Sequence, residues 1–266
     1  MSCLFRYLSI RRFLSSWLIP VVIIGLLTFL VSRGAENINY QWQWYRVGEF
    51  LIQFDKGEWF AGPLLKGLLI TLKISLLSLL LTLVLSLSTA ILRLSSSIVG
   101  RGLARGYLEL IRNTPLLIQL YLMYFVFGPI LGWDKMTTAI ISLSLFQAAY
   151  TSEIFRAGLR AFNRGQIEAG LSLGLSRTDN YRYIILPQVF RQMLPPLTNE
   201  AVSLIKNSSI VSVIAIFDLT TQGRNIIAKT FLTFEVWLMV AAIYLIITLT
   251  LSLIASMVER SKVFMK

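Results

Sequence analysis

The stretch "GLLITLKISLLSLLLTLVLSL", from Gly67 to Leu87, decides what kind of fold this chain adopts. Lys73 is its only charged residue, and the run is long enough to cross a bilayer, which takes about 20 residues at 1.5 Å each. The rest of the chain is similar: of its 266 residues 56% are hydrophobic and 14% charged, with a mean hydropathy of +0.70. This composition predicts a polytopic membrane protein.

Further apolar runs predict about six transmembrane helices and therefore an all-α membrane bundle. The predicted spans are Trp17–Ser32, Pro63–Leu92, Tyr107–Leu131, Thr137–Phe155, Thr198–Phe217 and Phe234–Val258. The first resembles a signal peptide but lacks a small-residue cleavage site after it, which favours a retained anchor. We therefore divide the chain into an anchor and external loop (1–62), a transmembrane domain (63–258) and a cytoplasmic tail (259–266).

The basic residues predict the orientation, because lysine and arginine collect in cytoplasmic loops. One set of connecting segments carries Arg6, Arg11, Arg12, Arg93, Arg101, Arg105, Arg156, Arg160, Arg164, Arg177, Arg182, Arg191, Arg260, Lys262 and Lys266. The opposite set carries Arg33, Arg46, Lys56, Lys135, Arg224 and Lys229, interspersed with acidic residues. Both termini are thus expected in the cytoplasm, and the Trp- and Tyr-rich loop 33–62 outside, at headgroup level.

Charge and composition argue against several classes of function. The net charge of +12 is spread between apolar spans, so we expect no nucleic-acid partner. The chain has no histidine and a single cysteine, Cys3, so we expect neither a disulfide nor a metal site. The acidic residues are scattered, which makes an intramembrane enzyme the weakest alternative. An ion-coupled secondary transporter is the stronger one, although it would need several acids buried within spans.

The segment 158–196, between the fourth and fifth predicted spans, is too long to be a passive connection. Its pattern predicts a helix, a turn and a second helix: Asn163 caps the first helix, Gly174 permits the turn, and Ser176 with Asp179 caps the second. Pro187 is expected to end or kink that second helix. Such a pair can lie on the lipid surface, pack under the bundle, or dock a partner protein.

The spacing within this segment resembles the EAA loop of permease subunits in ATP-binding cassette importers. Glu168-Ala169-Gly170 is followed by three residues, Gly174, nine residues, Ile184, one residue and Leu186-Pro187. The departure from the pattern is Gly170, where the third position is usually alanine. Four stretches, Gly67–Leu87, Tyr107–Phe125, Ala148–Leu159 and Leu204–Thr220, are similar to the polar amino acid branch of these permeases, the histidine/glutamine/glutamate permease-like family.

The resemblance implies a type I importer permease in a bacterial inner membrane, with no enzymatic activity and no cofactor of its own. ATP would be bound by a separate cytoplasmic subunit, since nothing in this chain resembles a phosphate-binding loop. The other implied partners are a second permease subunit, of the same or a related chain, an extracytoplasmic solute-binding protein and an amino acid substrate. The implied ATPase-coupling residues are Glu168, Ala169, Gly170, Gly174, Ile184, Leu186 and Pro187.

Polar residues at membrane depth are candidates for the substrate path. Asp218, Gln222 and Asn225 fall on one helix face, with Gly223 as a possible break, but an acidic cap in an outer loop is the alternative. Thr114 and Pro115 lie within a span, where a proline either frees a carbonyl for a cavity or simply kinks the helix.

Further polar residues have structural explanations. We expect Glu153 to pair with arginines, Arg156 and Arg112 being the nearest in the predicted spans, rather than to bind substrate. For Glu200 and Lys206 the same two roles are open, an ion pair within the bundle or contact with the substrate. A stripe of small polar residues is expected to mediate helix packing; it comprises Ser75, Ser78, Thr82 and Ser86.

Overall fold

The computed structural model describes residues 21–23, 25–26, 28–30, 32–34, 40–55, 57–160 and 164–263. The chain forms two compact units, Met1–Tyr45 and Arg46–Lys266. In the first unit the described residues between 21 and 34 are helical, as expected for an anchor, whereas Cys3 and the start of the first predicted span lie outside the described part. Three aromatic rings follow that helix, with Trp42 stacked on Trp44 and edge-on to Tyr40.

The second unit is helical apart from one short hairpin, so the all-α prediction is confirmed and the hairpin is an addition to it. A short 3-10 helix, η1 (Trp44–Arg46), lies at the junction of the units. The elements that follow are α2 (Gly48–Leu51), β1 (Ile52–Asp55), β2 (Glu58–Ala61), α3 (Pro63–Leu94), α4 (Ile98–Arg112), α5 (Leu116–Leu122), the π-helical η2 (Met123–Phe127), α6 (Gly128–Leu131), α7 (Lys135–Arg160), α8 (Arg164–Ser172), α9 (Arg177–Asp179), the π-helical η3 (Asn180–Ile185), α10 (Leu186–Asn207), the 3-10 helix η4 (Ser208–Ile214), α11 (Leu219–Thr230) and α12 (Thr233–Val263).

The hairpin is held against the start of the first long helix. Strands β1 and β2 are antiparallel, and the rings of Phe54 and Trp59 lie opposite each other with centroids 4.8 Å apart. The amide of Gly62 then donates a 2.6 Å hydrogen bond to the carbonyl of Leu51. Any Cβ at position 62 would overlap the Phe50 carbonyl, which explains the glycine. Pro63 opens α3 where a helix needs no N–H.

Two helices among the described residues are long and apolar enough to cross a membrane alone, Pro63–Leu94 and Thr233–Met257. Two bent pairs, 98–131 and 177–230, raise this number to four if each counts as one span. Helix α7 covers the fourth predicted span but is rich in Ser and Thr. The count of six spans therefore stays a prediction.

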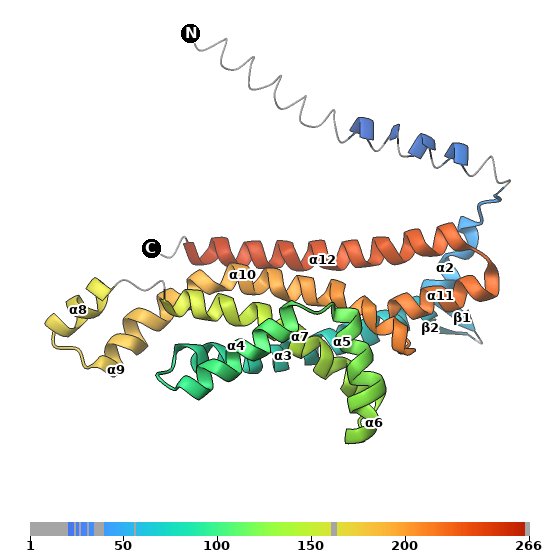
Figure 1. The fold of residues 1–266 in the computed structure, drawn as a ribbon. Helices are drawn as coiled ribbons and strands as arrows, with labels where there is room; N and C mark the ends of the chain where they lie inside the picture. Colours follow the sequence, from blue (N-terminus) through green and yellow to red (C-terminus); the bar gives the residue numbers. More distant parts are fainter. Residues whose placement is uncertain are drawn as a thin grey trace, which may run out of the picture. The chain divides into compact units, whose positions relative to one another are not determined.

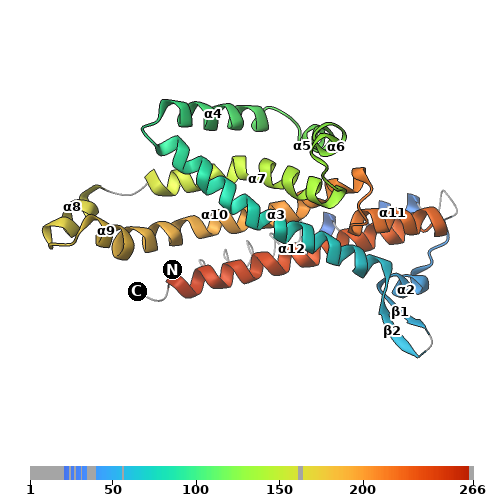
Figure 2. The ribbon, with the colours of Figure 1, turned by 90° about the horizontal axis from the view of Figure 1, so that it is seen from below.

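Helix α3 packs closely along α7, as the stripe of small polar residues predicted. The buried side of α3 consists of Thr71, Ser75, Ser78, Thr82, Ser86 and Thr89 together with glycine, alanine and two larger apolar residues. Where the helices touch, the Ser144 hydroxyl donates to the Ser78 carbonyl at 3.1 Å, and the Ser78 hydroxyl donates to the Ile140 carbonyl at 3.4 Å. Figure 2 shows α3 crossing α7 along much of its length.

The third predicted span is wrong as a single helix. Helix α4 ends at Arg112, and the next helical segment, Leu116–Leu131, leaves at an angle of 108°. Pro115 has no N–H to continue the α4 hydrogen-bond pattern, and the residue before a proline avoids helical geometry. A run of apolar composition therefore spans a corner that hydropathy alone does not reveal.

The second unit has two distinct ends (Figures 1 and 2). One end holds helices α8 and α9, the C-terminal part of α12 and the turn between α3 and α4. The other end holds α2, the β-hairpin formed by β1 and β2, and α11. Within this unit, the described basic segments of the predicted cytoplasmic set thus gather at the α8–α9 end. The side of the membrane that this end faces stays a prediction.

Substitution of Gly67 tests the packing of α11 on α3. A Cβ at position 67 would lie 2.8 Å from the carbonyl oxygen of Asp218 and 2.9 Å from the Cα of Leu219, both backbone atoms that cannot rotate away. We expect Gly67→Ala to destabilise the protein by about 1–3 kcal/mol, seen as a lower midpoint of thermal aggregation in detergent. The matched control is Gly106→Ala on α4, where no atom lies within 4 Å. An equal midpoint for both variants would contradict the packing.

Candidate functional site

The segment between α7 and α10 folds into a helical hairpin, residues 164–185. Its first arm, α8, ends in a Schellman turn: the Leu175 amide donates to the Gly170 carbonyl at 3.2 Å and the Gly174 amide to the Leu171 carbonyl at 3.0 Å. Gly174 adopts φ +80°, a left-handed conformation that favours glycine. The predicted turn at Gly174 is confirmed, whereas the predicted cap Asn163 lies outside the described residues.

The second arm begins with the predicted cap. The Ser176 hydroxyl oxygen accepts the Asp179 amide at 3.1 Å and donates to the Asp179 carboxylate at 2.6 Å. Pro187 was expected to end or kink this arm. It does not end it, because the chain passes from α9 through η3 into α10 without a break, and a kink at Pro187 stays a prediction. A π-helical turn precedes Pro187, which is one of the first residues of α10.

The second arm is anchored to the bundle by its buried face. Ile185, Val189 and Met193 form a cluster with residues of α7, including Ile154 and Leu159. Leu186, one of the implied coupling residues, is 50% exposed, and its neighbour Ile185 makes the anchoring contact.

The free surface of the hairpin combines polar and apolar side chains. Glu168 and Ala169 are exposed, whereas Gly170 is buried against the second arm. Leu173 at the tip is 82% exposed and Tyr183 is 65% exposed. Apolar residues with this exposure at the tip of a braced hairpin are suited to contact with another protein.

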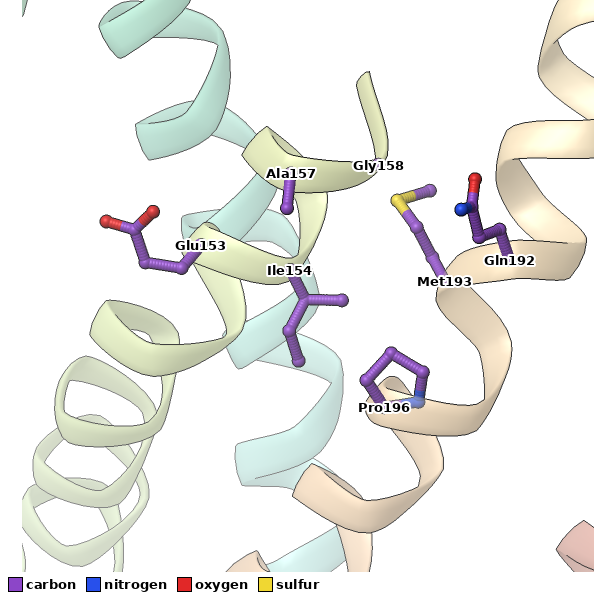
Figure 3. A pocket seen from close by; sticks show the side chains of 7 residues that line it. All are labelled: Glu153, Ile154, Ala157, Gly158, Gln192, Met193 and Pro196. Atoms are coloured by element: carbon purple, nitrogen blue, oxygen red, sulfur yellow. The ribbon is translucent and has the colours of Figure 1, made fainter. Parts of the chain in front are cut away.

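A hollow of about 360 Å³ lies between α7 and α10 where the hairpin joins the bundle (Figure 3). It is lined by Glu153, Ile154, Ala157, Gly158, Gln192, Met193 and Pro196. Its floor is narrow because Gly158 admits Met193: a Cβ at position 158 would lie 2.5 Å from the Met193 sulfur. In Figure 3 the Glu153 carboxylate points away from α10, so the hollow is mainly apolar.

Glu153 joins three helices through arginines, which confirms the predicted ion pairing. Arg156 lies one turn further along α7 and donates to the carboxylate at 2.6 Å, and Arg112 of α4 reaches it at 3.3 Å. Arg93 at the end of α3 is the third partner, which the sequence analysis did not foresee. Because one carboxylate is shared by three guanidinium groups, α3, α4 and α7 are tied together near the hairpin.

The corner between α4 and α5 is held by Gln119. Its amide nitrogen donates to the Ile111 carbonyl at 2.8 Å and to the Thr114 carbonyl at 3.0 Å. These are carbonyls that the break at Pro115 leaves without helical partners. For Thr114 and Pro115 the geometry favours the kink over a carbonyl aimed at a cavity, and the sequence signal for Gln119 was only a polar residue in an apolar run.

Asp218 caps α11. Its carboxylate accepts the Thr221 amide at 2.9 Å and the Thr220 amide at 3.2 Å, and the residue is completely buried. The interpretation of Asp218 as a substrate ligand is not supported by this geometry, because the carboxylate is already used within the chain. We had expected Gly223 to break the helix, and this is wrong. Gly223 lies inside α11, where it permits close contact with Val240. Gln222 packs beside Gly67, and Asn225 is half-buried.

A second polar group lies inside the bundle between α7 and α10. The Gln147 amide donates to the Glu200 carboxylate, and the Asn207 amide reaches Gln147 at 3.5 Å. Gln147 is 2% exposed, while Glu200 is half-buried. The sequence singled out Glu200 but not its partner, which is 53 residues away. Within the described residues no group of three or more His, Cys, Asp or Glu side chains forms a metal site.

Comparison with known proteins identifies relatives along most of the chain. A profile of the family described as "Binding-protein-dependent transport system inner membrane component" matches residues 78–263. The chain is 41% identical over 214 residues to the glutamine transport system permease protein GlnP of Escherichia coli K12, covering 79% of this chain and 98% of the relative. It is 36% identical over 199 residues to the arginine transport system permease protein ArtQ of Bacillus subtilis 168, covering 74% and 91%.

A solved structure has the same fold. The crystal structure of an amino acid ABC transporter with histidines superposes with a TM-score of 0.68 at 38% sequence identity. The match covers 75% of this chain and 94% of that chain. The similarity therefore extends over nearly the whole of the related subunits and leaves about a quarter of the present chain outside it.

The cap at Asp218 gives a prediction that separates capping from substrate binding. Asparagine caps helices about as well as aspartate, whereas alanine costs about 0.5–2 kcal/mol. If the carboxylate only caps α11, Asp218→Asn keeps solute uptake within about twofold and loses less stability than Asp218→Ala, because the asparagine oxygen still accepts one of the two backbone N–H groups. Thermal aggregation and uptake measured on both variants decide between the roles; loss of uptake in the stable asparagine variant would restore the ligand interpretation.

Proposed function

The chain belongs to the family of inner membrane components of binding-protein-dependent transport systems, and we propose that it is the membrane-spanning permease subunit of an ATP-driven importer of polar amino acids. In this proposal it sits in a bacterial inner membrane with both termini in the cytoplasm. It forms part of the translocation pathway, and a separate subunit binds and hydrolyses ATP.

The observation that carries the coupling role is the helical hairpin at the basic end of the bundle. It presents Glu168, Ala169 and the apolar tip residue Leu173 on its free side, while Ile185 and Val189 hold its other side to α7. A partner that grips the exposed arm can therefore move α10, since η3 and α10 are one continuous helix. We propose that this partner is the cytoplasmic ATPase.

The mechanism follows from two states of the bundle. ATP-driven closure of the ATPase would favour the state in which the hairpins of the two permease subunits are drawn together, and release would favour the other. A second permease, of the same or a related chain, completes the pathway, and an extracytoplasmic binding protein delivers the solute. The names of the relatives, which mention glutamine and arginine transport, support polar amino acids as the substrate class.

The buried pair Gln147 and Glu200 supports passage of a polar solute through the bundle. An amide and a carboxylate at this depth are costly unless they pair or face a polar path. They pair here, and part of Glu200 stays exposed, so we propose this carboxylate as a contact for the solute.

The exposed tip gives the test of coupling. We expect Leu173→Glu to insert and fold normally, because the side chain is 82% exposed. The same change would place a charge in the contact with the ATPase and reduce its co-purification and ATP-dependent uptake by ~10-fold or more, as for interface hot spots. The measurement is affinity purification of the full chain co-expressed with its ATPase, followed by uptake of labelled glutamine and arginine in proteoliposomes.

The matched control is Phe231→Glu, at an equally exposed position, 81%, at the opposite end of the unit. It should leave co-purification of the ATPase unchanged. Undiminished co-purification and uptake by Leu173→Glu would count against the coupling role. Substrate uptake by the purified chain alone, driven by a proton gradient and without the ATPase, would instead establish the secondary transporter.

A further inference from the structure

Gly170 and Asn180 face each other across the two arms of the helical hairpin. A Cβ atom at position 170 would lie 2.5 Å from Nδ2 of Asn180 and 2.7 Å from its Cγ and Oδ1. Cβ atoms essentially never approach other heavy atoms within 3.0 Å. No side chain therefore fits at position 170 while Asn180 keeps its place.

The contact is the interior of an otherwise exposed hairpin. Asn180 is completely buried and Gly170 is buried, although Glu168 and Ala169, directly before Gly170, are exposed. Within the described part of the chain α8 packs mainly against η3. The separation of the two arms is therefore set where the backbone of Gly170 meets the amide of Asn180.

The two positions are complementary in size. In the loop pattern that this chain resembles, position 170 carries alanine, whose methyl group would occupy the space that the Asn180 amide fills here. We propose that Asn180 is a positioning residue of the hairpin: its side chain holds α8 against η3, and Gly170 is the residue that admits it. This inference rests on the proposed coupling function, because the hairpin is then the part that moves.

The placement of Asn180 gives this contact its role in transmission. On one side of it lies α8, with the exposed Glu168; on the other, five residues along a continuous helix, lies Ile185 in the cluster with α7. A force applied to α8 reaches η3 and α10 through the Gly170–Asn180 contact and through the Schellman turn at Gly174. A gap or a clash at this contact would let α8 shift without moving α10.

The first test uses the purified full chain in detergent and does not depend on transport. Trypsin can cut at Arg177 and Arg182, which are exposed on the hairpin. We expect Gly170→Ala to speed cleavage by ~10-fold, because cleavage follows the population of the opened hairpin. The double variant Gly170→Ala/Asn180→Ala should return to within about twofold of the parent, as coupled neighbours do.

The matched control is Gly102→Ala, also inside a helix but with no atom within 4 Å of its Cβ position. Alanine is a better helix former than glycine, so this control should be cut no faster than the parent. Helix propensity alone predicts the same for Gly170→Ala. The direction of the change thus separates a steric pair from an ordinary helical glycine.

The second test measures coupling in proteoliposomes that contain the chain, its ATPase and its binding protein. We expect Gly170→Ala to lower the maximal rate of amino acid uptake by ~10-fold with little change in the half-saturating substrate concentration, since only the transmitted motion is affected. The double variant should recover most of the rate. If Gly170→Ala merely damaged the hairpin, the additional Asn180→Ala substitution would not be expected to restore the uptake rate.

The outcomes separate this inference from the proposed function. If Gly170→Ala is cut like the parent, or if the double variant does not recover resistance to trypsin, the steric pair is refuted. If cleavage behaves as expected but all variants take up substrate at the parental rate, the pair exists and the hairpin does not couple. That second result overturns the positioning role together with the coupling part of the proposed function.

Discussion

The constraint on which this structure depends is that polar backbone groups in a membrane must find partners within the protein. Two irregular points in the described helices are supplied with one by a side chain. Gln119 takes the carbonyls freed at the corner before Pro115, and Asp218 takes the amides at the start of α11. Polar residues that sequence alone suggests as substrate ligands thus bond backbone groups where a helix breaks. These breaks let the chain change direction within a bundle of long helices.

The same economy applies to the contacts between helices. Lipid tails are as apolar as leucine, so close packing and hydrogen bonds, rather than burial from water, must hold α3 to α7. Serine and threonine supply both, through short side chains and through hydroxyls such as Ser144 that reach carbonyls across the interface. The larger polar tie at Glu153 lies near the hairpin end, where three arginines share one carboxylate and so connect α3 and α4 to α7, the helix that precedes the hairpin.

The sequence predicted those parts whose cause is local. The caps at Ser176 and Asp179, the turn at Gly174 and the long apolar helices α3 and α12 all follow from neighbouring residues. What it missed depends on residues far apart in the chain: Arg93 and Glu153 are 60 positions apart, and Gln147 and Glu200 are 53 apart. Asp218 shows a second limit, since a buried cap and a buried ligand have the same composition and spacing until the amide partners of the carboxylate are known.

The helical hairpin is stiffened in three different ways. Gly174 fixes the turn through its left-handed backbone, the Ser176–Asp179 pair fixes the start of the second arm, and η3 continues directly into α10 on the side that enters the bundle. A loop of about twenty ordinary residues would absorb a displacement of a few ångströms in its own dihedrals. A braced helix pair instead passes the displacement to the helix it continues into, and Ile185 and Val189 in turn pack α10 against α7. A rigid connection of this kind is what a transporter needs if its energy source is a different polypeptide.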